Sequence, residues 1–242
     1  MVKYKILKFT LLAGALIFLA GCLYPEEQRR QNQPVYEEQL QSVQSAVLRY
    51  QENTGVLPIK TRDADTPVFR KYPINFSQLV PAYLESPPGN SFESGGTFQY
   101  VLVTPEETPE VKLIDLRTVR VIQELERRVF QYRSEHRYAP VKEVAGNELL
   151  KLDYEKLNYD EEPVVESPFH PDHRLPLLLQ TDGSIVIDYS LDIKFYLDEH
   201  GEDSYEEGDD LRWLLVEHSP FVPAYSIPQT AEDGEVVFKT AE

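Results

Sequence analysis

The sequence contains only one cysteine, one methionine and one tryptophan, and its acidic residues far outnumber its basic ones. A lone cysteine excludes a disulfide within the chain, so oxidation cannot stabilise the fold. The 24 Lys and Arg residues against 41 Asp and Glu residues give a formal net charge of −17. Because nucleic-acid binding requires a basic face that neutralises phosphates, this charge argues against nucleic acid as a partner.

Motifs of well-known catalytic and cofactor sites are missing as well. The chain has no Gly-x-Ser-x-Gly turn, no phosphate-binding loop and no dinucleotide fingerprint. We therefore expect a protein that is not an enzyme, with no catalytic residue, no cofactor and no bound metal. An envelope hydrolase is the least favoured alternative.

Long apolar runs are scarce, and the one near the N-terminus is short. Lys3, Lys5 and Lys8 form a basic start, and Leu11–Leu19 is an apolar core of nine residues. A membrane-spanning helix needs about 20 residues, so this run is too short to cross the hydrocarbon. It has the length and the basic flank of a signal peptide.

The residues after this run indicate how the signal ends. Leu19-Ala20-Gly21-Cys22 resembles the lipobox of bacterial lipoproteins, in which a peptidase cleaves before the cysteine and a diacylglycerol is attached to its thiol. The resemblance implies cleavage between Gly21 and Cys22, lipidation of Cys22 with fatty acids such as palmitate, and an anchor on the outer face of the cell membrane. The alternatives are a secretory signal with an incidental cysteine and a retained membrane helix.

Cleavage would also change the charge of the chain. Loss of residues 1–21 removes three lysines and takes the formal charge from −17 to −20. This negative charge is typical of a folded domain that does not bind the surface of an anionic membrane. Cations, basic peptides and basic proteins are compatible partners on charge alone, although acids that serve only solubility are the preferred interpretation.

Two segments carry the same apolar spacing and predict two helices. Their stripes superpose at a constant offset of 82 residues: Leu40, Val43, Val47 and Tyr50 in the first, and Ile122, Leu125, Val129 and Tyr132 in the second. Steps of three, four and three residues place such side chains on one face of a helix. Gly55 and Pro58 favour the end of the first helix, and Pro140 follows the second at the same offset. We interpret Tyr50 and Tyr132 as core residues in preference to ligand-stacking aromatics.

The likeness continues downstream in matched order. A candidate short helix, a Ser-Pro pair and two β-like segments follow each stripe: 75–79, 86–87, 97–103 and 111–114 in the first repeat, and 153–157, 167–168, 177–180 and 184–189 in the second. Asn75 and Asp153 are the expected caps of the short helices. Asp182-Gly183 predicts a tight hairpin. Asp182, Asp188 and Asp192 flank that hairpin, but no acid–base pair is inferred from them.

This order predicts an α+β fold with two tandem helix-plus-antiparallel-sheet units. The predicted organisation is a signal peptide at 1–21, lipidated Cys22 and a polar tether at 22–33, a first unit at 34–116, a second unit at 117–197, and an acidic loop, short helix and proline-rich tail at 198–242. Within the last segment, residues 211–216 predict a helix capped by Asp209 or Asp210. Residues 236–238 predict an edge strand or a disordered end.

Two segments carry residue types that metals bind. His170-Pro171-Asp172-His173 offers imidazoles and a carboxylate to zinc, but Pro171 prevents a helix from aligning them, and a solvated loop is preferred. The acidic loop 198–210 offers carboxylates to calcium without the regular spacing of a calcium loop. Calcium binding there stays open, and a solvated face is preferred.

Four stretches of the first repeat match a known pattern: Ala46-Val47-Leu48-Arg49-Tyr50, Gly55-Val56-Leu57-Pro58, Leu79-Val80-Pro81-Ala82-Tyr83-Leu84 and Ser86-Pro87-Pro88-Gly89-Asn90-Ser91-Phe92. Through them residues 40–102 resemble the globular domain of the major pseudopilin of type II secretion systems. That family has a long apolar N-terminal helix, whereas this chain has a lipobox-like site and a polar segment, so filament assembly is not implied. The whole chain also resembles uncharacterised lipoproteins of bacilli, which implies no activity.

We therefore expect a non-enzymatic protein-interaction module that is held at the membrane through the lipid on Cys22 and binds another envelope protein. The alternative is a solute- or cation-binding lipoprotein associated with a transporter. Such proteins are usually longer and built from two α/β lobes. The sequence leaves open the identity of the partner, the oligomeric state and whether the two units share one core.

Overall fold

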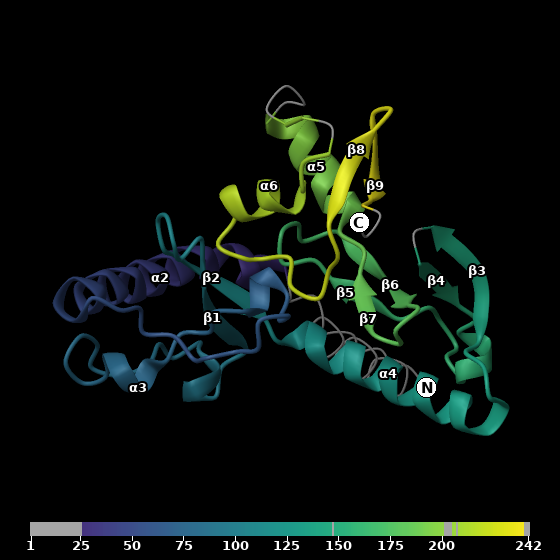
Figure 1. The fold of residues 1–242 in the computed structure, drawn as a ribbon, viewed down its shortest axis with the longest axis horizontal. Helices are drawn as coiled ribbons and strands as arrows, with labels where there is room; N and C mark the ends of the chain where they lie inside the picture. Colours follow the sequence, from purple (N-terminus) through teal and green to yellow (C-terminus); the bar gives the residue numbers. More distant parts are fainter. Residues whose placement is uncertain (1–25, 147, 201–204, 207, 240–242) are drawn as a thin grey trace, which may run out of the picture. The chain divides into compact units, whose positions relative to one another are not determined.

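The structure is a computed structural model that describes residues 26–146, 148–200, 205–206 and 208–239, with side chains from residue 36 on (Figure 1). The predicted signal peptide 1–21, its cleavage at Gly21 and the lipidation of Cys22 lie outside these residues. The chain divides after Glu37, and the residues from Glu38 on form one compact unit. Among the described residues, no helix is long and apolar enough to cross a membrane.

The first repeat forms helix α2 (Glu26–Thr54), the short turns η2 (Val68–Arg70), α3 (Phe76–Leu79) and η3 (Phe92–Ser94), and strands β1 (Phe98–Val103) and β2 (Glu110–Asp115). The second repeat forms α4 (Arg117–His136), β3 (Val141–Gly146), β4 (Leu149–Leu152), η4 (Glu155–Leu157), β5 (Val164–Glu166), β6 (Arg174–Gln180) and β7 (Ile185–Ile187). The remainder forms α5 (Ser190–His200), α6 (Arg212–Glu217), β8 (Gln229–Glu232) and β9 (Glu235–Phe238). The predicted α+β class is confirmed.

The two predicted helices are present, and the middle of the first apolar stripe and most of the second are buried. Val43 and Val47 of α2 are fully buried, as is Leu125 of α4. Both helices end on a residue with positive φ at the same offset of 82 positions: Gly55 at +74° and Arg137 at +71°. Backbone N–H groups of both residues bond to the carbonyl four positions earlier, which closes each helix. Helix α2 begins at Glu26, so residues 26–33 of the predicted tether are helical.

The first repeat has a small antiparallel sheet. Strands β1 and β2 pair in register from Phe98 opposite Asp115 to Val103 opposite Glu110. The sheet is extended on both sides by isolated bridges, Pro73 to Val101 and Leu113 to Phe221. The second bridge shows that the proline-rich tail runs beside β2, where the N–H of Leu113 donates to Pro220 O at 2.9 Å.

The second repeat has a larger, five-stranded sheet in the order β3-β4-β6-β5, with β7 also paired to β6. Helix α4 packs along this sheet and contributes Ile122, Leu125 and Val129 to its core (Figure 1). The predicted Asp182-Gly183 hairpin is confirmed, because Gly183 has a φ of +97° and its N–H donates to Gln180 O at 2.9 Å. Strands β3, β4 and β5 were not predicted.

Several predicted boundaries and caps are wrong. Residues 198–200 belong to helix α5, because this unpredicted helix continues into the segment assigned to the acidic loop. Asn75 and Asp153 make no side-chain cap bond. Instead, Asn75 Oδ1 accepts a hydrogen bond from Ser77 Oγ, and Asp153 forms an ion pair with Lys156. Leu211 occupies the N-cap position of helix α6 and makes no side-chain cap bond. The predicted role of Asp210 is correct in part, because its Oδ1 accepts the backbone N–H of Arg212, the first residue of the helix, at 3.2 Å and its carboxylate also binds the Arg212 guanidinium.

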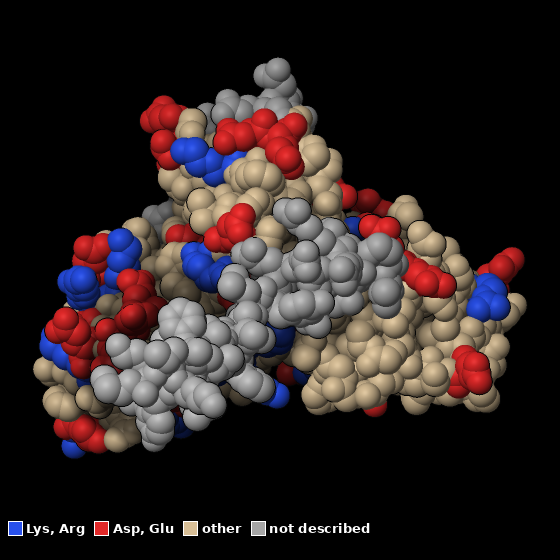
Figure 2. Space-filling model, turned by 180° about the vertical axis from the view of Figure 1, so that it is seen from behind, with Lys and Arg blue, Asp and Glu red and all other residues tan. Residues whose placement is uncertain are grey.

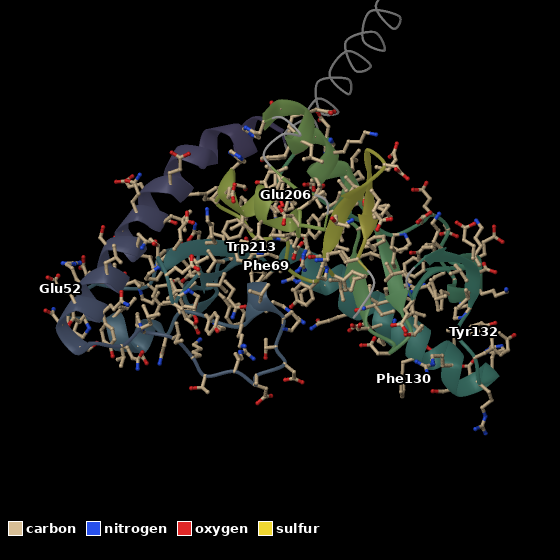
Figure 3. The ribbon with its side chains drawn as sticks, turned by 45° about the horizontal axis from the view of Figure 1, so that its top comes forward. Glu52, Phe69, Phe130, Tyr132, Glu206 and Trp213 are labelled. Carbon is tan, nitrogen blue, oxygen red and sulfur yellow. The ribbon has the colours of Figure 1, made fainter. Side chains whose placement is uncertain are left out.

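The C-terminal segment, predicted as a tail, connects two apolar clusters. Leu211, Leu214 and Leu215 pack in the cluster of α4 and the five-stranded sheet. Val216, Val222 and Ala224 pack in the cluster of β1 and β2. Figure 3 shows Trp213 of α6 beside Phe69 of η2, with ring centroids 5.0 Å apart. The two repeats therefore keep separate apolar clusters, and one short segment joins them.

The joining segment should be as important for stability as a core helix. We expect Leu215→Ala, which truncates a fully buried side chain, to lower the free energy of unfolding by about 2–5 kcal/mol. Leu191→Ala is the matched control, because Leu191 of the neighbouring helix α5 is 47% exposed. Urea unfolding measures both. Equal losses in the two variants would contradict the bridging role.

Candidate binding site

Two hollows lie on the surface of the second repeat, and they differ in how their polar groups are used. The first is a groove of about 500 Å³ along α4 and η4, lined by Arg127, Arg128, Gln131, Tyr132, Glu135, His136, Lys156, Leu157 and Asn158. The Lys and Arg residues of its lining are already paired with carboxylates, and Glu135 accepts a hydrogen bond from the amide of Gln131. Arg127 and Arg128 both bind Glu124, and Lys156 binds Asp153. Little unpaired charge remains there for a ligand.

The groove also shows where the two repeated tyrosines lie. Tyr132 packs against the edge of the core cluster and stacks on His136, with ring centroids 4.0 Å apart, so it is half-buried and lines the groove at the same time. Tyr50 is half-buried and meets the edge of Tyr83 at 5.4 Å. Figure 3 places Tyr132 near Phe130, which is 74% exposed on the same helix. The prediction that both tyrosines are core residues is therefore correct only in part, because each ring is half-buried.

The second hollow is a cleft of about 480 Å³ between the five-stranded sheet and the β8–β9 hairpin. We call it the hairpin cleft. Its apolar lining is Ala145, Pro176, Leu178, Val236, Val237 and Phe238, and its polar lining is Lys151, Glu162, Asp188, Ser190 and Glu232, with Gly146 completing the wall. Leu178 and Phe238 belong to the apolar cluster on this face of the sheet. The cleft thus combines an apolar floor with acidic side chains.

Asp188 is the most firmly held of these acids. Its Oδ1 accepts hydrogen bonds from Ser190 N at 2.9 Å, Ser190 Oγ at 2.5 Å and Gln229 Nε2 at 3.2 Å. Ser190 begins α5 and Gln229 lies on β8, so the contacts tie the end of β7 to two other elements. Gln229 is fully buried and its Oε1 has no hydrogen-bond partner among the described residues. Since all three bonds reach Oδ1, Oδ2 is the oxygen left for a ligand.

The net charge of the lining is negative. Glu162, Asp188 and Glu232 face a single cation, Lys151, whose ammonium is bound to Glu143 of β3 at 2.5 Å. The pKa of Lys151 is raised first by this hydrogen bond to Glu143, with smaller contributions from Glu162 and Asp188. Glu162 and Glu232 form no ion pair or hydrogen bond with another described residue, so their carboxylates remain available. On the face shown in Figure 2, acidic side chains are spread over the surface with Lys and Arg between them.

Sequence reasoning singled out only one residue of this cleft, Asp188. The signal that could have located it is the repeated Asp-x-Ser pattern at 182–184 and 188–190, since each aspartate binds its serine in the same way. Asp182 forms the hairpin turn, as predicted, and lies outside the cleft. The same local motif therefore occurs once at a turn and once in the cleft.

The histidine segment 170–173 was predicted as a solvated loop, and this is wrong for its second histidine. His173 Nδ1 lies 2.6 Å from Asp192 Oδ1, and Asp192 is fully buried in α5. Ser167 Oγ donates to Asp192 Oδ2 at 2.7 Å and also accepts from the backbone of Phe169. The segment is held against α5 by this network. No group of three or more possible metal ligands is found in the described part of the chain.

The Ser167–Asp192–His173 network does not have the geometry of nucleophile activation. In a catalytic triad the serine donates to the histidine, and the histidine donates to the aspartate. Here the serine donates directly to the aspartate, so the imidazole has no hydroxyl to deprotonate. The arrangement fixes a loop. The acidic loop 198–210 is described only in part, because residues 201–204 and 207 lie outside the described residues, and its calcium binding stays untested.

Comparisons with known proteins add one finding. Residues 36–115 match the model of the YphF family N-terminal domain, which is less than half of the chain. This range contains residues 36–54 of helix α2 and the β1–β2 sheet, and it nearly coincides with the predicted unit 34–116. No curated protein and no solved structure matches. The match names neither a lipoprotein nor a pseudopilin, so those two resemblances stay predictions.

Burial of Asp192 predicts a pH effect of definite sign. Desolvation raises its pKa above the usual value of 3.8, against the opposing hydrogen bonds from His173 and Ser167. The folded state therefore binds the proton more tightly, and the stability of the wild type falls as pH rises through the raised pKa. We expect the wild-type free energy of unfolding, minus that of Asp192→Asn, to decrease in urea titrations as pH rises above the usual aspartate pKa of 3.8.

Asp182→Asn is the control of opposite sign. The hydrogen bonds from Ser184 lower the pKa of Asp182, so its stabilising effect is present above the usual pKa and is lost as pH falls. The wild-type free energy of unfolding, minus that of Asp182→Asn, should therefore increase with pH. Parallel slopes for the two variants would show that burial does not govern Asp192.

Proposed function

We propose that this chain is a lipid-anchored extracytoplasmic protein that binds a partner protein of the cell envelope and catalyses no reaction. The observation that carries the binding role is the hairpin cleft, with its apolar floor and its unpaired carboxylates on Glu162 and Glu232. Apolar surface supplies most of the binding free energy of an interface, and a few fixed polar groups supply orientation. Asp188, held by three hydrogen bonds, is such a fixed group.

Binding is favoured over catalysis by the way in which the cleft serine is held. Ser190 Oγ donates to Asp188 and accepts from Gln229 Nε2 at 2.6 Å, and these bonds tie the start of α5 to the end of β7 and to β8. None of the cleft-lining residues is a histidine or a cysteine. A serine held in this way, without a neighbouring imidazole, lacks the base that activates a nucleophile.

The anchor and the extracytoplasmic location are supported by the sequence. Basic residues, a short apolar run and Leu19-Ala20-Gly21-Cys22 occur in the order of a lipoprotein signal. The pseudopilin-like segment 40–102 adds a likeness to a protein that works within an envelope assembly. A second candidate function is the binding of a small solute or cation, because a cleft of about 480 Å³ is within the size range of ligand pockets, about 300–1,000 Å³.

The anchor and the partner can be tested together. We expect the wild type to incorporate labelled palmitate and to sediment with membranes, and Cys22→Ala to do neither, because the acyl chains are attached to this thiol. Crosslinking in intact cells, followed by affinity purification and mass spectrometry, should recover an envelope protein with the wild type.

A crosslinked partner that is lost with Cys22→Ala would support the proposal. Equal palmitate incorporation by both forms would refute the anchor. If the wild type sediments with membranes but enriches no protein, while a metabolite or cation raises its melting temperature, the solute-binding function replaces the proposed one.

A further inference from the structure

We infer that the hairpin cleft receives a lysine or arginine side chain of the partner, flanked in the partner by apolar residues. This inference rests on the proposed function and identifies the chemistry of the group that is bound. Three features of the cleft carry it: the charge of its lining, the free oxygen of Asp188 and the apolar floor.

The charge of the lining selects a cation. Three carboxylates face one ammonium in the cleft, and that ammonium, on Lys151, is already paired with Glu143 outside the lining. The excess of negative charge would repel an anionic ligand, and a neutral ligand would gain no attraction from it. A cationic group would also be attracted from a distance, because the whole chain has a formal charge of −17.

Asp188 offers a defined point of contact. Its Oδ1 is occupied by Ser190 and Gln229, which fix the orientation of the carboxylate. A charged donor can therefore bind Oδ2 without reorganisation of the side chain, and hydrogen bonds between ionised groups are about twice as strong as neutral ones. Glu162 and Glu232 are exposed carboxylates of the same lining and would remain partly in water.

The apolar floor distinguishes a long basic side chain from a bare metal ion. Pro176, Leu178 and Phe238 line the same cleft as the carboxylates and contribute apolar groups to it. Lysine and arginine bury their methylene stems on such surface and keep the charged end at a polar group. A bare ion would leave this surface without a contact, and metal binding would require more converging ligands than the lining is shown to provide.

Strand β3 favours a peptide over a free amine. Ala145 and Gly146 line the cleft, and the adjacent Val144 on the same strand is 73% exposed. β3 is the edge strand of its sheet, so its outer backbone groups are not engaged by another strand of that sheet. An extended backbone can follow this edge, and an apolar residue next to the bound basic residue can contact the apolar lining of the cleft.

Binding of short peptides to the purified full-length protein tests this inference. The probe is acetyl-Leu-Lys-Leu-amide, and its comparison peptide has norleucine, which keeps the methylene stem but lacks the ammonium. Isothermal titration should give affinity for the lysine peptide at least about tenfold above that for the norleucine peptide. Asp188→Asn should remove most of this preference, because an amide keeps the bond to Ser190 but has no charge.

Asp182→Asn is the matched control, because it makes the same charge change in the same Asp-x-Ser motif outside the cleft. It should bind both peptides as the wild type does. If Asp188→Asn does not fold, Glu232→Gln, at an exposed position of the lining, should lower the lysine preference severalfold. Equal affinity for the two peptides, or an unchanged preference in Asp188→Asn or in Glu232→Gln, would overturn the inference.

Further outcomes show whether the bound cation belongs to a protein or to a small molecule. They also distinguish failure of this inference from failure of the proposed function. n-Butylamine that binds as tightly as the lysine peptide would overturn a protein source and assign the cleft to a small organic cation. Undiminished recovery of the crosslinked envelope partner by Asp188→Asn would overturn the inference while leaving the proposed function intact. Failure of the proposed function alone would appear as selective peptide binding without any crosslinked envelope protein.

Discussion

The buried ammonium of Lys112 holds together the parts of this protein that are far apart in sequence. Lys112 lies on β2 and is 5% exposed. Its Nζ donates to Val216 O at 2.7 Å and to Ser219 O at 3.0 Å, and it pairs with Glu110 at 2.7 Å. A buried charge is tolerated only when such partners replace water. The two carbonyls lie at the end of α6, where unsatisfied acceptors attract a cation.

This contact explains why the C-terminal segment is part of the core. Once Lys112 fixes the end of α6, the chain continues along β2 through Pro220 and Val222 and then reaches β7, where the N–H of Ile187 donates to Tyr225 O at 2.8 Å. The segment therefore contacts the sheets of both repeats. It also leads directly into β8 and β9, which form one wall of the hairpin cleft. The cleft thus depends on the path of a segment that, by composition, resembles a tail.

The elements that were not predicted from the sequence include β3 and α5, and both lack the regular apolar spacing that marks a strand or a helix. Strand β3 is exposed on both faces, so it lacks the alternation that marks a half-buried strand. Helix α5 lacks a clear apolar stripe, because it buries Asp192 beside Ile193 and exposes Leu191. The cleft was missed for a related reason. Its acids come from the residue after β7, from β8 and from the loop before β5, and no spacing in the sequence connects them.

The sequence by itself determined the features that depend on neighbours along the chain. These are the two amphipathic helices, the left-handed end of the first helix at Gly55, the Asp182-Gly183 hairpin, the α+β class and the excess of acidic residues, because periodicity and turn chemistry are local properties. Only the tertiary structure decided that the tail joins the two apolar clusters, that His173 reaches the buried Asp192, and that Asp188 and the β8–β9 hairpin line the same cleft. Each of these depends on pairing between distant segments, which is selected by the burial of whole faces and leaves no spacing in the sequence.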